Sequence, residues 1–195
     1  NKGLYYALKE NKNILPIFIY DKNILDKLNK NDHRVEFINQ SLKEINFVLS
    51  KNNKAISIFY DKPEKVFNHL IASYRIKNIY LNKDYTPYAT KRDNTIKNLC
   101  KENGIVLNEY KDHVLYEKSE IVKDDGLPYK VYTPYSRKWL SNMPETKITT
   151  YPSDTLTKNL VTNDNKFDFS SMGFVKSNIP TPKTNISKKI IDNYE

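Results

Sequence analysis

The sequence predicts an α/β fold in which a parallel sheet is flanked by helices. Short apolar runs alternate with amphipathic helical patterns over about the first 140 residues, as they do in repeated strand–helix units. Some of the runs end at an aspartate or asparagine, and the helical patterns begin and end at residues that commonly cap helices. Together these observations favour strand–helix units joined by right-handed crossovers.

Four apolar runs are predicted to form the strands. The runs are continuous and do not alternate with polar residues, which is typical of parallel strands that are buried on both faces. They cover residues 14–20, ending at Asp21, residues 55–60, ending at Asp61, residues 78–81 and residues 104–107.

Three amphipathic helices are predicted between the strands, and each has a boundary signal. Asp32 is a good N-cap for the first helix, and Pro63 fits the first turn of the second. The third helix is predicted to end at Asn103 and Gly104, a pair that is common at helix ends. The expected apolar faces are Val35, Phe37, Ile38, Leu42, Ile45, Val48 and Leu49 in the first helix, Val66, Phe67, Leu70 and Ile71 in the second, and Ile96, Leu99 and Cys100 in the third.

The sequence opens with a helical pattern that has no strand before it. This helix carries Leu4, Tyr5, Ala7 and Leu8. In the predicted architecture the central strand precedes this helix, so we expect the first strand, within about 20 upstream residues, to be missing from the chain. The sheet would then have two unpaired edges, and the run 14–20 would tend to aggregate.

The composition of the chain changes from about Asn142 onward. Prolines stand among Ser, Thr, Asn and Lys, and apolar runs are few, which is typical of a linker that wraps the surface of a domain. We therefore expect an α/β domain over residues 1–141 and a linker over residues 142–195. The prolines are Pro144, Pro152, Pro180 and Pro182.

The composition also argues against several classes of protein. No stretch of about 18 apolar residues is present, so we expect no span of a membrane. The first ten residues, NKGLYYALKE, lack the basic and apolar regions of a secretion signal. The sequence is therefore expected to belong to a soluble, cytoplasmic protein.

Few residues offer catalytic or metal-binding chemistry. Cys100 is the single cysteine, which excludes an internal disulfide and a cysteine-cluster metal site, and we expect it to be a small core residue. His33, His69 and His113 are dispersed and lack the spacing of metal ligands. With four glycines, the chain has no dinucleotide-binding fingerprint. We expect no metal and no catalytic residue in this segment.

The charge of the chain leaves a nucleic-acid partner open. The formal net charge is +9 and the pI is about 9.3, which favours a polyanionic partner. The lysines are spread along the chain, however, and do not form one basic cluster. The charge is thus compatible either with a nucleic-acid-binding face or with a general coding bias toward lysine.

Three segments are more specific than a general α/β pattern. They read DHRVEFI at residues 32–38, NKDYTPYATKRD at 82–93 and GLPYKVYTPY at 126–135, the last continuing through SRKW to Trp139. Their order and spacing resemble the N-terminal domain of the DNA photolyase/cryptochrome family, and the resemblance covers Asn1 to Trp139. It implies a Rossmann-like domain with a parallel sheet in flavodoxin-like order, followed in the family by a helical FAD-binding domain that we expect to be absent from this chain.

The resemblance also implies the residues of a pigment site. In the family, an arginine matching Arg34 lines the cleft of the antenna pigment, and an aspartate matching Asp84 contacts the pigment in deazaflavin-type members. Phe18, Ile19 and Tyr20 would form an apolar wall. Each residue has a structural alternative: Arg34 could pair with Asp32, Asp84 could cap the turn that follows it, and the three wall residues could be core.

The same resemblance bears on the pigment itself. Folate-type antenna sites in bacterial photolyases use an acidic residue in the loop after the strand that precedes Asp84, and the matching position here is Ala89. We therefore expect a deazaflavin or a flavin as the antenna chromophore, in preference to methenyltetrahydrofolate, with FAD bound in the absent helical domain.

The function implied is that of a deoxyribodipyrimidine photolyase, which repairs cyclobutane pyrimidine dimers in UV-damaged DNA with light. The segment here would hold the light-harvesting pigment, and the fragment alone would be inactive. The full-length protein would be a monomer. Two alternatives stay open at this point: a cryptochrome-type blue-light photoreceptor, or a freestanding α/β module that binds nucleotides or nucleic acid.

Overall fold

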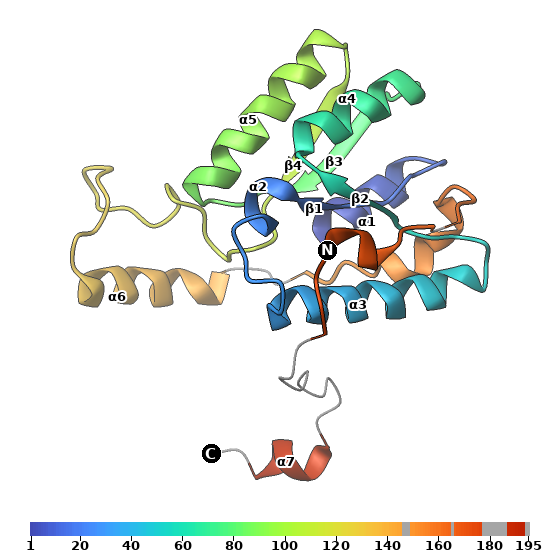
Figure 1. Cartoon of the computed structure of the whole chain (residues 1–195). Coiled ribbons are helices and arrows are strands. Elements are labelled where there is room, and N and C mark those ends of the chain that lie inside the picture. The colour runs from blue at the N-terminus through green and yellow to red at the C-terminus, as the bar shows by residue number, and fades with distance from the viewer. Residues whose placement is uncertain (146–148, 165, 177–186, 194–195) are drawn as a thin grey trace. The chain divides into compact units, whose positions relative to one another are not determined.

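A computed structural model describes residues 1–145, 149–164, 166–176 and 187–193 of the chain (Figure 1). The chain forms two compact units, each built from two separate stretches of sequence. Unit 1 comprises Asn1–Ile14 and Pro63–Val161, and unit 2 comprises Leu15–Lys62 and Thr162–Glu195. Each unit contains one pair of parallel strands flanked by helices.

Unit 2 is built on the parallel pair of β1 (Ile17–Asp21) and β2 (Ser57–Asp61). The short helix α2 (Lys22–Leu25) follows β1 directly, and the long helix α3 (His33–Ser50) leads to β2. Register places Phe18 opposite Ile58 and Tyr20 opposite Tyr60. Because successive side chains on a strand point to opposite faces, these four residues share one face of the pair.

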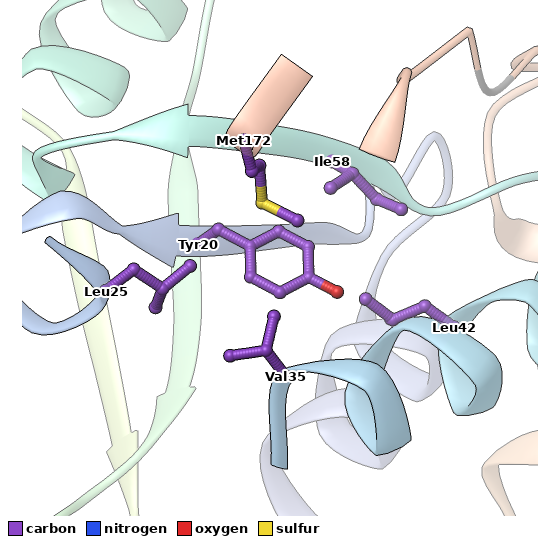
Figure 2. Packing of buried hydrophobic residues seen from close by; sticks show 6 residues of the cluster. All are labelled: Tyr20, Leu25, Val35, Leu42, Ile58 and Met172. Carbon is purple, nitrogen blue, oxygen red and sulfur yellow. The ribbon is translucent and has the colours of Figure 1, made fainter. Parts of the chain in front are cut away.

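That face forms the hydrophobic core of unit 2. Figure 2 shows the ring of Tyr20 surrounded by aliphatic side chains from β2, α2 and α3 and by the side chain of Met172. Met172 ends the 3-10 helix η3 (Phe169–Met172) and is only 2% exposed. The buried members of the cluster are Tyr20, Leu25, Val35, Leu42, Ile58 and Met172, and Phe167, Phe169 and Phe174 pack against them.

Unit 1 is built on the parallel pair of β3 (Asn78–Asn82) and β4 (Val106–Tyr110). Ile79 and Leu107 are opposite each other and pack with Ile96 and Cys100 of α5. The helix α1 packs against the same two strands, next to Tyr80 and Tyr110. The helices of unit 1 are α1 (Lys2–Glu10), α4 (Pro63–Ser73), α5 (Pro87–Glu102) and α6 (Tyr132–Asn142), with the 3-10 helices η1 (Met143–Glu145) and η2 (Ser153–Asn159).

The predicted helix boundaries are confirmed. The Asp32 carboxylate accepts a hydrogen bond from the backbone N–H of Arg34 at 2.9 Å and caps α3, and Pro63 is the first residue of α4. Asn103 caps the end of α5, and Gly104 follows it with φ of +65°, in the left-handed region that favours glycine. The expected apolar face of α3 is too wide, because Phe37, Ile45 and Val48 are exposed.

Three of the four strands begin later than the apolar runs that predicted them, and β3 begins at Asn78, as predicted. Gly104 lies in a turn, and the N–H of Ile105 bonds to the carbonyl of Cys100, so β4 begins at Val106. The N–H of Ile56 bonds to the side chain of Asn46 at 2.7 Å, and β2 begins one residue later. Ile14 forms a parallel bridge with Leu160 and does not belong to β1.

The four strands form two pairs, β1 with β2 and β3 with β4. The predicted flavodoxin-like order, 2-1-3-4-5, would pair β2 with β3 if its first strand were absent, so the observed pairing differs from it. The Rossmann order, 3-2-1-4-5, leaves the two observed pairs when its first strand is absent. Within the described residues, neither β1 nor β3 has a strand on its other side. The presence of a strand upstream of Asn1 stays a prediction.

The region predicted to be a linker contributes buried residues to both units. Leu160 is 5% exposed in unit 1, and Met172 is 2% exposed in unit 2. The division at residue 141 stays a prediction, and two of the linker prolines, Pro180 and Pro182, lie outside the described residues. Among the helices that are described, none combines the length and the apolar character needed to cross a membrane.

Candidate functional site

Arg34 lies in the first turn of α3 and forms a two-point ion pair with Asp32. Its Nε is 3.0 Å from Oδ1 of Asp32, and its Nη2 is 2.6 Å from Oδ2. This contact lowers the pKa of Asp32 to about 2, chiefly because the guanidinium hydrogen bonds favour the charged carboxylate. The structural alternative for Arg34 is thus observed. The side chain of Arg34 remains 66% exposed, so its flat face is also accessible to a planar ligand.

Asp84 lies in the loop between β3 and α5 and is partly buried. Its carboxylate accepts a hydrogen bond from the backbone N–H of Thr86 at 3.0 Å. That bond lowers the pKa of Asp84, with a smaller contribution from the positive charge of Arg92. Thr86 in turn caps α5 by accepting from the N–H of Ala89 at 3.3 Å. The capping alternative for Asp84 is therefore also observed.

Arg92 completes the charged group near Asp84. Its Nε is 2.7 Å from the Oδ1 of Asp93, the next residue on the helix. The Arg92 side chain is 29% exposed, and its charge interacts with Asp84. Asp84, Arg92 and Asp93 thus form one compact charged group at the start of α5.

The predicted wall residues lie on both faces of β1. Tyr20 is 2% exposed, and its hydroxyl donates a hydrogen bond to Asn39 Oδ1. Burial raises the pKa of the Tyr20 phenol. The ring of Phe18 meets that of Tyr20 edge-on with centroids 4.9 Å apart, and Ile19 points to the opposite face of the strand. Core packing accounts for Phe18 and Tyr20, and a role in ligand binding stays a prediction for all three.

Arg34 contacts Asp32, and both belong to unit 2, as do the β1 residues Phe18, Ile19 and Tyr20. Asp84 and Arg92 belong to unit 1. Assembly of Arg34 and Asp84 around one ligand therefore stays a prediction.

The sequence analysis missed a polar cluster at the N-terminus of α1. In many α/β proteins such a helix N-terminus, at the carboxyl ends of strands, binds a phosphate. Here side chains accept from its first N–H groups: Lys2 N–H donates to Asp112 Oδ1 at 2.9 Å, and Gly3 N–H donates to Asn82 Oδ1 at 2.8 Å. The N–H of Leu4 donates to the Asn1 side chain at 2.9 Å. These donors are thus satisfied by the chain itself.

Gly3 allows this close contact between α1 and β3. A Cβ atom at residue 3 would lie 2.8 Å from Asn82 Oδ1 and 3.2 Å from the backbone carbon of Leu81. The Asn82 amide also donates to Asp112 Oδ2 at 3.1 Å, so it bridges the helix and the loop after β4. The sequence signal for this cluster was the pair of polar residues at the strand ends: Asn82 is the last residue of β3, and Asp112 lies two residues after β4.

A second missed network joins the loops after β3 and β4. The Glu117 carboxylate accepts from Lys83 Nζ at 3.1 Å and from the Tyr85 hydroxyl at 2.8 Å. Desolvation, together with the bond to Glu117, raises the pKa of Tyr85 to about 12. Lys111 pairs with Glu120 at 2.7 Å. The network fixes both loops, and its charges are mutually neutralised. In the part of the chain that the structure describes, no three His, Cys, Asp or Glu side chains gather as metal ligands.

Comparison with known families identifies the class of the protein. The family model described as DNA photolyase matches residues 1–153, which is most of the chain. The chain therefore belongs to the DNA photolyase family, and its α/β fold is that of the N-terminal domain of these proteins.

Individual relatives include both photolyases and cryptochromes. The chain is 24% identical to a deoxyribodipyrimidine photo-lyase of Synechococcus sp. over 77% of its length, and 25% identical to cryptochrome-1 of Rattus norvegicus over 83%. These alignments span 31% of the photo-lyase and 27% of the cryptochrome. The chain thus spans about a third or less of either relative.

Two solved photolyases share the fold. The bacterial class III photolyase of Agrobacterium tumefaciens matches 91% of this chain and 36% of its own with a TM-score of 0.75 and 21% identity. The archaeal photolyase of Sulfolobus tokodaii matches 71% of this chain and 31% of its own with a TM-score of 0.61 and 32% identity. The latter structure is described as containing two FAD molecules, with the implication of a novel light-harvesting cofactor.

Proposed function

We propose that this chain is the antenna-binding domain of a deoxyribodipyrimidine photolyase. The full-length protein would bind UV-damaged DNA as a monomer, and FAD in a helical domain beyond the linker would donate an electron to a cyclobutane pyrimidine dimer. The observation that carries the proposal is the family match over residues 1–153. The domain would contribute a fixed position for the pigment, because energy transfer to FAD falls steeply with distance.

Arg34 and Asp84 would bind the pigment. Arg34 supports this role because Asp32 holds its guanidinium at two points while the side chain stays 66% exposed. A fixed, flat cation can stack on a heterocycle or donate to its carbonyl oxygens. Phe18 and Ile19 would line the site, and Tyr20 would support them from the core.

A deazaflavin or a flavin is the proposed pigment. Ala89 is buried at 1% exposure and offers no carboxylate to a folate, and the Sulfolobus tokodaii photolyase, 32% identical, is described with a second FAD. Riboflavin-class and deazaflavin chromophores present the planar carbonyl edge that a guanidinium recognises.

Binding of defined pigments to the full-length protein tests this proposal. We would titrate FMN, a deazaflavin and methenyltetrahydrofolate and follow the quenching of pigment fluorescence. Arg34→Lys removes the planar guanidinium but keeps the positive charge. Asp84→Asn keeps an oxygen that can accept from the Thr86 N–H but removes the negative charge. Because a hydrogen bond to a charged group is worth about 1.5–3 kcal/mol, each variant should weaken pigment binding by about 10- to 150-fold.

Matched controls separate the site from general charge effects. Arg75→Lys and Asp154→Asn change exposed residues of the same types and should leave binding unaltered. Equal affinity of Arg34→Lys, Asp84→Asn and wild type would overturn the site. Selective binding of methenyltetrahydrofolate would overturn the pigment class.

A cryptochrome-type photoreceptor is the second candidate, favoured by the 25% identity to the rat cryptochrome. Illumination of the full-length protein with dimer-containing DNA distinguishes the two, because only a photolyase restores the intact pyrimidines. A freestanding nucleic-acid-binding module would instead be indicated by strong, salt-sensitive binding of duplex DNA to this chain alone.

A further inference from the structure

Three tyrosine rings of unit 1 are stacked nearly parallel between α1 and the sheet. The rings of Tyr6 and Tyr110 have centroids 5.0 Å apart and planes 5° apart. The rings of Tyr110 and Tyr80 follow at 6.2 Å and 7°. We call Tyr6, Tyr110 and Tyr80 the tyrosine ladder. Tyr5 and Tyr151 extend it, with centroids 5.4 and 6.0 Å from that of Tyr6.

The fold explains this alignment. Register pairs Tyr80 with Asn108 and Asn82 with Tyr110, so the two tyrosines are diagonal neighbours on one face of the strand pair. The opposite face carries Ile79 and Leu107 of the hydrophobic core. Tyr6 projects from α1 onto the same face as the strand tyrosines. The ladder is therefore held by a helix and two strands, all within unit 1.

The two ends of the ladder differ in charge. Lys9 Nζ is 5.6 Å from the ring centre of Tyr5 and 5.9 Å from that of Tyr6, and Lys2 Nζ is 5.6 Å from that of Tyr151. A cation over an aromatic face stabilises the neutral ring, so removal of an electron becomes harder there. At the other end stands the negative charge of Glu10, close to Tyr80. An electron vacancy is thus disfavoured at the lysine end and favoured at Tyr80.

Tyr80 also has a proton acceptor in place. Its hydroxyl donates to Glu10 Oε2 at 2.9 Å and accepts from Asn11 Nδ2 at 2.9 Å. Burial and the neighbouring Glu10 charge raise the pKa of Tyr80, so its phenol stays protonated at neutral pH until an electron leaves. Glu10 is exposed to solvent. Of the ladder rings, Tyr80 is the one whose hydroxyl bonds to a carboxylate among the described residues.

We propose that the tyrosine ladder is a redox relay that carries a one-electron oxidising equivalent to Tyr80. In the final step an electron passes from Tyr80 through Tyr110 to the oxidant, which is reduced by one electron. The O–H bond of Tyr80 breaks, and its proton moves to the Glu10 carboxylate and then to water. The products are a neutral tyrosyl radical at Tyr80 and the reduced oxidant, so atoms and electrons balance.

The oxidant of the intact protein would be a photoexcited flavin, an assignment that rests on the proposed function. The relay itself depends only on residues of unit 1. A test with an added photo-oxidant therefore needs neither pigment nor DNA, and its failure would leave the proposed antenna function untouched.

The test is flash–quench oxidation of the full 195-residue chain with photo-oxidised ruthenium tris-bipyridine. The yield of neutral tyrosyl radical is read by transient absorption and by electron paramagnetic resonance after freeze-quenching. The chain has 15 tyrosines, so indiscriminate oxidation would make Tyr80→Phe lower the yield by only about one fifteenth. The relay predicts that Tyr80→Phe loses most of the yield although the ring and its stacking remain.

Two further variants separate the relay from simple packing. Glu10→Gln removes the proton acceptor and should slow radical formation several-fold. Tyr110→Phe keeps a stacked ring that is harder to oxidise, and it should slow the arrival of the vacancy at Tyr80. Tyr74→Phe is the control, at a residue that is 56% exposed and outside the ladder. It should lower the radical yield by no more than about one fifteenth, the share expected for indiscriminate oxidation of the 15 tyrosines.

Circular dichroism and thermal melting would verify that each variant is folded. Equal radical yields in Tyr80→Phe and Tyr74→Phe would overturn the relay. An unchanged rate in both Glu10→Gln and Tyr110→Phe would overturn it as well, and would leave the ladder as packing.

Discussion

In unit 1, the carboxyl ends of β3 and β4 meet the N-terminus of α1, and Asn82 and Asp112 take up its N–H groups. In unit 2, Arg34 lies in the first turn of α3, and its side chain is paired with Asp32 yet largely exposed. Both regions carry polar residues after parallel strands, where α/β proteins bind ligands. The comparison teaches that hydrogen-bond saturation, more than position in the fold, decides which region retains donors for a ligand.

The two units also differ in how their cores are closed, because Met172, from a segment late in the chain, completes the core of unit 2. The largest loss of stability is therefore expected for a substitution of Met172. Met172→Ala should lower the free energy of unfolding by about 2–5 kcal/mol, because it leaves a cavity beside Tyr20 in unit 2. Urea unfolding measures the change. Met143→Ala, at a residue 41% exposed in unit 1, is the matched control and should alter stability little. Equal effects of the two substitutions would show that residues after 161 do not complete the core.

The saturated N-terminus of α1 gives the second effect. Asn82→Ala should cost about 1–3 kcal/mol, because the N–H of Gly3 loses its acceptor and Asp112 loses a donor. Thermal melting of the variant measures this loss, with Asn68→Ala on the exposed side of α4 as the control. Binding of inorganic phosphate by Asn82→Ala and not by wild type would show that the Asn82 side chain blocks N–H donors at the N-terminus of α1. A stability equal to that of wild type would contradict the saturated arrangement.

The Asp32–Arg34 pair predicts a smaller, pH-dependent effect. The pKa of Asp32 falls from its ordinary value of 3.8 to about 2 in the folded chain. A depressed pKa contributes stability above pH 3.8, and this contribution is lost as the pH falls toward 2. Asp32→Asn keeps a good helix cap but removes the charge. The difference in melting temperature between wild type and Asp32→Asn should therefore be largest near neutral pH and shrink below pH 3.8. A difference in melting temperature that grows as the pH falls would contradict a stabilising Asp32–Arg34 ion pair.

The smallest effect is expected for an exposed ion pair in unit 2 that involves neither Arg34 nor the N-terminus of α1. Lys166 and Asp164 are 3.8 Å apart, and their side chains are 85% and 82% exposed. Lys166→Ala should change the free energy of unfolding by less than about 0.5 kcal/mol, because solvent screens such pairs. Urea unfolding checks this, and a loss of the size expected for Asn82→Ala would mean that exposure is a poor guide in this chain.

Local signals in the sequence predicted much of the fold. Asp32, Pro63 and the Asn103–Gly104 pair mark helix boundaries because capping depends on a few neighbouring residues. Strand starts were less accurate, because Ile14 forms a bridge with Leu160 and the N–H of Ile56 donates to the Asn46 side chain. The apolar pattern does not reveal these partners. Such partners are fixed by the tertiary fold.

The candidate site was predictable only in part. Arg34 and Asp84 were found through motifs, and the contacts that hold them, with Asp32 and Thr86, follow from short-range hydrogen-bond chemistry. The tyrosine ladder was not predicted, because periodicity assigns a residue to a face and does not specify ring geometry. Met172 was missed for a related reason: it lies in a short segment without a strand or long-helix pattern, and its burial depends on contacts with β1 and α3.

The docking of the segment around Met172 has a consequence for anything joined to the chain beyond it. The N–H of Val175 donates to the carbonyl of Lys30 at 2.8 Å, and Lys30 Nζ reaches the carbonyl of Met172 at 3.2 Å. A fluorescent label attached at Lys176 would therefore be held within one residue of this anchored point. Its effective concentration near unit 2 would be that of a very short linker, and not that of a linker counted from Asn142.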